Sequence, residues 1–81
     1  MEDRIRNLNQ KIKALDSINE IQQTWSQVLD KITDEERYRY ILMLESAKFF
    51  MLEGDFARVN REYRAIQLYL LNIQLRGRDA A

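Results

Sequence analysis

Apolar residues recur at spacings of three and four along almost the whole chain, which is the periodicity of helices. They are densest at residues 38–52, YRYILMLESAKFFML, where only four positions are polar: Arg39, Glu45, Ser46 and Lys48. A helix that is apolar most of the way round must be covered on several sides. We therefore expect a central helix at about 34–53, with the other helices packed around it.

Two helices are expected before it. Ile5, Leu8, Ile12 and Leu15 step by three, four and three, which predicts a helix at about 2–15 with one thin apolar seam. The run Ser17-Ile18-Asn19-Glu20 has the form of a capping box and predicts the start of a second helix at about 18–31, centred on Trp25. The alternative is a kink at Asp16 and Ser17 within one long helix, and the pattern leaves both readings open.

The remaining helix ends carry local signals. Thr33 to Glu36 form another capping box, with acidic residues at the helix N-terminus where the helix dipole favours them. Gly54 stands where a helix C-terminus often needs positive φ, and Asp55 can cap the next helix. The last helix, at about 56–75, is predicted by a stripe at helical spacing: Phe56, Val59, Tyr63, Ile66, Leu70 and Ile73.

These elements predict an all-α fold, a small antiparallel bundle of three to four helices in a single domain, 1–81, with a helical hairpin across Gly54. Residues 38–52 are expected between the Trp25 helix and the last helix, and 76–81 as a polar tail. Pro is absent and Gly occurs twice, so turns suited to strands are scarce.

The segment from Tyr40 to Ile73 resembles a single tetratricopeptide repeat. The residues that carry the resemblance are Ala47, Phe50, Gly54-Asp55-Phe56, Val59, Tyr63 and Ile66. It implies two closely nested antiparallel helices. Val59 and Ile66 stand where that family has smaller residues, no Pro closes the unit, and one copy forms no array. The resemblance therefore carries no binding residues over.

The composition argues against several chemistries. The chain has no Cys and no His, so disulfides and thiolate zinc sites are excluded, and the commonest metal ligand and general base are missing. Capping explains the one carboxylate cluster, Asp34, Glu35 and Glu36, without a metal. We expect no catalytic, cofactor-binding or metal-binding residue, no cofactor, and a protein that is not an enzyme.

Charge and hydropathy bear on location. Thirteen basic and thirteen acidic residues give no net charge, which argues against strong attraction to nucleic acid. Met1 is followed by two acidic residues rather than a secretory signal, and no apolar run approaches the roughly 20 residues of a membrane span. We expect a cytoplasmic protein with no membrane partner.

Apolar residues make up 46% of the chain, more than one small bundle can bury. Two sets are predicted to contact a protein partner: Leu68, Leu71 and Leu75, and Ile5, Leu8, Ile12 and Leu15. The first hypothesis is therefore a protein-interaction module, an adaptor, co-chaperone or inhibitor, that docks a partner helix or forms a homodimer.

The alternative is a small transcriptional or nucleoid-associated regulator. Arg58, Arg61 and Arg64 step by three and are possible nucleic-acid contacts, although they also fit a solvated face with Asp55 and Glu62 as local partners. Tyr38 and Tyr40, which alternate with arginines, are a second candidate, as a platform for stacking bases.

Overall fold

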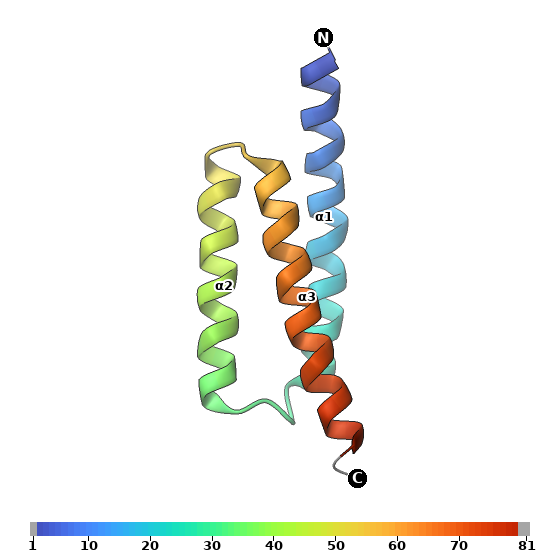
Figure 1. Ribbon diagram of the computed structural model, residues 1–81, viewed down its shortest axis with the longest axis vertical. Coiled ribbons are helices and arrows are strands. Elements are labelled where there is room, and N and C mark those ends of the chain that lie inside the picture. Colours follow the sequence, from blue (N-terminus) through green and yellow to red (C-terminus); the bar gives the residue numbers. More distant parts are fainter. Residues whose placement is uncertain (1, 80–81) are drawn as a thin grey trace.

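A computed structural model describes residues 2–79 as three helices, α1 (Glu2–Val28), α2 (Asp34–Leu52) and α3 (Phe56–Asp79). The all-α prediction is confirmed. The chain turns back twice, so α1 and α3 run in the same direction and α2 runs opposite to both (Figure 1). The first turns of α1 extend past the connection between α2 and α3, and the bundle is long and narrow, 52 × 19 × 15 Å.

α1 is one continuous helix, which corrects the expected pair of helices at 2–15 and 18–31. Ser17 lies half-buried inside the helix and does not begin a new one. The physical reason is the buried face of α1, on which Ala14, Ile21 and Val28 recur every seven residues and are almost fully covered. This face continues through residue 17, and no Gly or Pro interrupts the backbone there.

The central helix is α3 and not α2, which corrects the expected sandwich around residues 38–52. Cα atoms of α3 approach those of both α1 and α2 within 8 Å, whereas no such approach joins α1 to α2 among the described residues. Val59, Ile66 and Leu70 of α3 are completely buried. In α2 only Tyr40 and Ala47 are buried, so the most apolar helix lies at the edge of the bundle, with α3 between it and α1 (Figure 1).

Polar pairs set the register between α1 and α3. Asn60 Nδ2 donates to the side-chain oxygen of Gln10 at 2.7 Å and to its backbone oxygen at 3.0 Å. Further along, Gln67 Nε2 donates to Thr24 Oγ1 at 3.0 Å, and Gln74 Nε2 donates to Gln27 Oε1 at 2.7 Å. The three donors recur every seven residues on α3. These hydrogen bonds hold the two helices in one alignment, while the amide oxygens Asn60 Oδ1 and Gln67 Oε1 are buried without a hydrogen-bond partner among the described residues.

α1 and α2 meet through an aromatic pair. The rings of Trp25 and Tyr40 stack with centroids 4.0 Å apart and an angle of 8° between their planes. The pair fills the space between two helices whose backbones do not approach closely. Burial raises the pKa of the Tyr40 hydroxyl above its usual value.

The start of α2 is joined to the end of α3. The predicted capping box is present: Thr33 Oγ1 accepts from the Glu36 N–H at 3.1 Å, and Glu36 Oε1 accepts from the Thr33 N–H at 3.0 Å. The two terminal guanidinium nitrogens of Arg76 also donate to the Glu36 carboxylate, at 2.7 and 2.9 Å. Hydrogen bonding from Arg76, then from Thr33, lowers the Glu36 pKa from 4.5 to about 2.

This ion pair corrects the expected polar tail. α3 continues to Asp79, so residues 76–79 are helical, and the rest of the expected tail, 80–81, lies outside the described residues. At its other end, α3 follows Gly54, whose φ of +78° lies in the left-handed region that glycine adopts most easily. Asp55 Oδ1 then accepts from the Arg58 N–H at 3.2 Å.

Candidate functional site

Single exposed apolar side chains are normal on a protein surface, but here they are arranged in stripes. Each of the three helices carries one set on the side that its neighbours do not cover. These surfaces, and the shallow grooves beside them, are the candidate functional sites of the chain.

The outer stripe of α1 consists of four residues that are 53% to 58% exposed: Ile5, Leu8, Ile12 and Leu15. At 100° per residue they lie on the side of the helix that faces away from Ala14 and Ile21. The structure thus places this predicted interface set together on one uncovered helix face.

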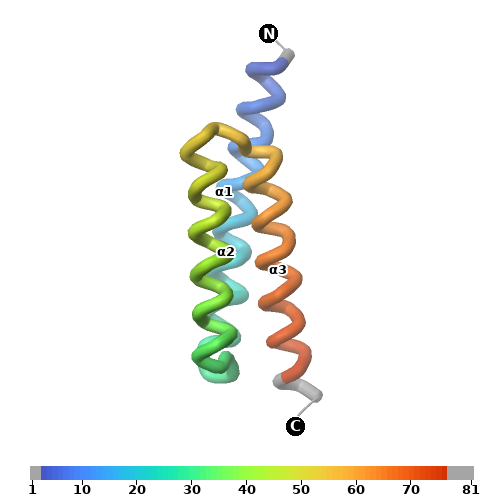
Figure 2. The backbone as a smooth tube through the Cα atoms, turned by 60° about the vertical axis from the view of Figure 1, so that its left-hand side comes forward, coloured from blue at the N-terminus to red at the C-terminus, as the bar shows by residue number. Residues whose placement is uncertain are grey.

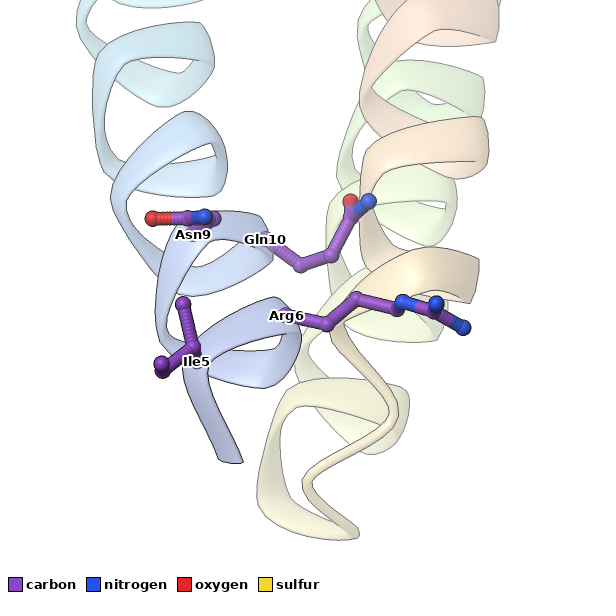
Figure 3. A pocket seen from close by; sticks show the side chains of 4 residues that line it. All are labelled: Ile5, Arg6, Asn9 and Gln10. Carbon is purple, nitrogen blue, oxygen red and sulfur yellow. The ribbon is translucent and has the colours of Figure 1, made fainter. Parts of the chain in front are cut away.

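Ile5 also belongs to a depression of about 440 Å³ near the start of α1, lined by Arg6, Asn9 and Gln10 as well. Figure 3 shows Arg6 and Gln10 directed toward the neighbouring helices and Ile5 and Asn9 directed away from them. Because all four residues come from one helix, the depression is a feature of the surface rather than an enclosed ligand site.

On α3, Leu68, Leu71 and Leu75 are all exposed. Leu68 does more than protrude, because it lines a groove of about 530 Å³ between α2 and α3. Met43 and Arg39 form the α2 side of this groove, and its α3 side is completed by Ala65, Tyr69 and Asn72. Within this predicted set, the structure assigns Leu68 to a built concave surface.

The α2–α3 groove lies on the side of α3 away from α1. On α3, Asn60, Gln67 and Gln74 face α1, whereas Ala65 and Asn72 line the groove. The Tyr69 hydroxyl donates to the Glu36 backbone oxygen at 3.4 Å, which ties the ring to α2 at the end of the groove. α1 thus packs on one face of the α2–α3 pair, and the groove lies on the other face.

α2 carries an apolar stripe that sequence reasoning had assigned to the core. Tyr38, Leu42, Phe49 and Leu52 recur at helical spacing, and all are exposed, Leu52 by 80%. Tyr40, Met43, Ala47 and Phe50 form a second stripe on the opposite side, which packs on the bundle. Spacing alone indicates that α2 has two apolar sides, but it does not indicate which one the bundle covers.

The proposed platform of Tyr38 and Tyr40 is not formed, because the two rings lie on different sides of α2. Tyr40 is buried against Trp25, and Tyr38 is exposed. A pair of aromatic residues that alternate with arginines therefore offers no common surface for stacking bases.

The structure also divides the three arginines of α3. The Arg58 guanidinium carbon lies 4.6 Å from the centroid of the Phe50 ring, a cation–π contact on the α2 side. Arg61 and Arg64 line a small groove of about 190 Å³ between α3 and α1, to which α1 contributes Lys13. Two of the three predicted residues thus share a basic groove with a lysine that sequence spacing did not connect to them.

Within residues 2–79, no group of three or more acidic residues is placed to hold a metal ion, and no helix combines the length and apolar character of a membrane span. No protein-family model matches the chain, and neither a curated protein nor a solved structure matches it significantly.

Proposed function

We propose that this chain is a non-enzymatic protein-interaction module that docks an amphipathic helix of a partner protein and also associates with itself. The observation that carries the proposal is the α2–α3 groove, which is lined by the exposed Leu68 and the half-buried Met43. Adaptors, co-chaperones and inhibitors are the classes of protein that this mode of binding serves.

The geometry of the groove favours a helix as its ligand. Two helices packed side by side leave a furrow along their length, and a third helix fills such a furrow with residues at three and four spacing. Leu71 and Leu75 are also exposed on the part of α3 that follows Leu68, and we include them in the proposed site. Arg39 stands at the α2 edge, so the partner helix is expected to carry an acidic residue beside its apolar stripe.

The size of the chain supports the same proposal. A domain of 81 residues buries a small core, and such domains often gain stability by binding partners or by oligomerising. The described core has ten buried apolar residues, while thirteen large apolar residues are exposed. A docked partner helix would cover part of this exposed apolar surface.

The proposal is tested by selecting ligands from a displayed library of helical peptides on the immobilised full chain. We expect enriched peptides with apolar residues at three and four spacing, and their binding should be lost with Leu68→Glu. Leu42→Glu is the matched control, because Leu42 is 51% exposed against 56% for Leu68 but lies outside the groove. Peptides that bind equally to both variants, or a selection that enriches no helical peptide, would contradict the proposal.

The extension of the site along α3 has its own test. Leu71→Glu combined with Leu75→Glu should weaken binding of the selected peptides by about tenfold or more, since each substitution replaces an apolar contact with a charged side chain. If the double variant leaves peptide binding and self-association unchanged, these two leucines belong to neither interface.

The alternative function, a regulator that contacts nucleic acid, is favoured by one observation, the groove that Lys13 shares with Arg61 and Arg64. Salt distinguishes the two functions. Binding to phosphates weakens steeply as salt concentration rises, whereas apolar helix docking changes little. A mobility-shift titration with duplex DNA at two salt concentrations, repeated with Arg61→Ala and Arg64→Ala, checks this alternative.

A further inference from the structure

The outer stripe of α1 is longer than its four apolar residues. In heptad notation, position a is occupied by Ile5, Ile12, Asn19 and Ser26, and position d by Leu8, Leu15, Gln22 and, one residue past the end of α1, Leu29. Every one of these eight side chains is exposed. α1 therefore has two heptad faces, one that builds the bundle and one that no part of the described chain covers.

The residue types on this face favour a particular partner. Among parallel coiled coils, isoleucine at a with leucine at d favours a dimer over a trimer or tetramer, because of how the two side-chain shapes pack at these positions. A single asparagine at a, here Asn19, fixes the alignment and the number of helices in a coiled coil at a cost in stability. Both features occur here in sequence, two Ile/Leu heptads followed by the asparagine.

The flanking charges distinguish the orientations. In a parallel pair, the residue at g faces the residue at e of the next heptad on the other chain, so Lys11 faces Asp16 and Arg4 faces Asn9. In an antiparallel pair that matches Ile5 with Leu15, Lys11 of one chain comes close to Lys11 of the other. Opposite charges meet in the first arrangement and like charges in the second.

Lys11 and Asp16 are available for such a contact. Both are exposed, and the salt bridge among the described side chains joins a different pair, Arg76 and Glu36. Lys11 Nζ lies 6.0 Å from the centroid of the Phe56 ring, at the outer limit of a cation–π contact, so little holds it in place.

The fold leaves room for a second helix at this face. α3 packs on the opposite side of α1, which α2 reaches through the Trp25–Tyr40 stack. The first turns of α1 extend past the α2–α3 connection, as both backbone views show (Figures 1 and 2). Because packing on α3 already holds α1 helical from about Gln10 onward, pairing does not have to order that part of the helix, which lowers the entropic cost of association.

We propose that a second copy of this chain occupies this face, so that two α1 helices form a short parallel coiled coil over about residues 4–22. The inference extends the self-association part of the proposed function, since it names the interface and its orientation. It is independent of the α2–α3 groove, which lies on other helices.

Solution mass tests the interface. Light scattering on the full chain over a concentration series should show a species of two chains, and Ile12→Glu should weaken its formation by about tenfold or more. The fold should remain, since Ile12 is exposed, and circular dichroism checks this. Leu42→Glu, the same substitution on the outer stripe of α2, should leave the mass unchanged. A wild-type chain that is monomeric throughout, or a dimer that Ile12→Glu leaves intact, overturns the inference.

Charge reversal and cross-linking test the orientation. Lys11→Glu should weaken the dimer, and adding Asp16→Lys should restore it. Because the chain has no cysteine, Ile5→Cys introduces a unique thiol that a parallel pair brings face to face for oxidation to a disulfide. Preferential cross-linking between Ile5→Cys and Leu15→Cys chains indicates an antiparallel pair and overturns the proposal.

The two proposals fail separately. If the parallel coiled coil is wrong but the groove function is right, groove-selected peptides bind both wild type and Ile12→Glu while the dimer is unaffected by Ile12→Glu. If the groove function is wrong, Leu68→Glu leaves peptide binding unchanged, whatever the outcome for the dimer.

Discussion

α2 and α3 form one antiparallel pair, yet the more apolar helix of the two is the less buried. α3 carries one continuous buried stripe, from Val59 to Ile73, which α1 and α2 cover from two sides, in addition to its three exposed leucines. α2 divides its apolar residues between two opposite stripes, and the bundle covers one of them. In this chain the central helix is the one that presents a continuous apolar face bordered by side chains that donate hydrogen bonds to a neighbouring helix.

The polar borders of α3 show this in detail. Asn60, Gln67 and Gln74 each find a partner on α1. α2 has no comparable row, and it is held by the Trp25–Tyr40 stack, by its packing on α3, and by Glu36 at its start. The second apolar stripe of α2 thus remains at the surface of the chain.

The largest expected effect comes from replacing one isoleucine in each of these two helices. Ile66→Ala in α3 removes a side chain that is 0% exposed, and we expect a loss of about 2–5 kcal/mol in the free energy of unfolding. Ile41→Ala in α2, where the side chain is 47% exposed, should cost less than about 1 kcal/mol. Urea denaturation measures both. Equal losses would mean that α2 is covered as fully as α3.

A second test concerns the aromatic contact that holds α2 against α1. Tyr40→Leu keeps an apolar side chain but removes the stacked ring, and we expect a loss of about 1 kcal/mol. Tyr38→Leu, two residues away on the exposed side, should change stability by less than about 0.5 kcal/mol. Urea denaturation followed by Trp25 fluorescence reports on this contact. If the two leucine variants were equally stable, the stack would contribute nothing to the placement of α2.

The smallest expected effect is the pH dependence that Glu36 confers. Its pKa is lowered from 4.5 to about 2 in the folded chain, so its contribution to stability is complete above about pH 4.5 and is lost as the pH falls toward 2. Glu36→Gln removes this titration. The difference in urea midpoint between wild type and variant should therefore be largest near neutral pH and should shrink below pH 4.5.

A direct measurement separates this effect from other carboxylates. NMR titration of the Glu36 side chain should give a pKa well below 4.5, and Arg76→Ala should bring it back toward 4.5, because Arg76 is the largest cause of the shift. A Glu36 pKa near 4.5 in the wild type would contradict the link between the start of α2 and the end of α3.

The placement of site residues depended on how many helices each site involves. The α1 stripe was predicted residue by residue, because exposed positions at three and four spacing on one helix need no neighbour to define them. The α2–α3 groove was found only in part, through Leu68. Its other residues, among them Met43 and Tyr69, come from two helices whose alignment no local pattern encodes. The same limitation hid the approach of Lys13 to Arg61 and Arg64.

By itself, the sequence determined that the described chain is helical and where α2 begins. These features depend on groups a few residues apart, such as the Thr33 hydroxyl and the Glu36 N–H. Tertiary structure decided that α1 runs unbroken through Ser17, that α3 is central, and that Arg76 reaches Glu36. Each of these features depends on which helix faces become buried against a neighbouring helix and which stay exposed. Residues 50 positions apart, such as Gln10 and Asn60, settle it only when the whole chain has folded.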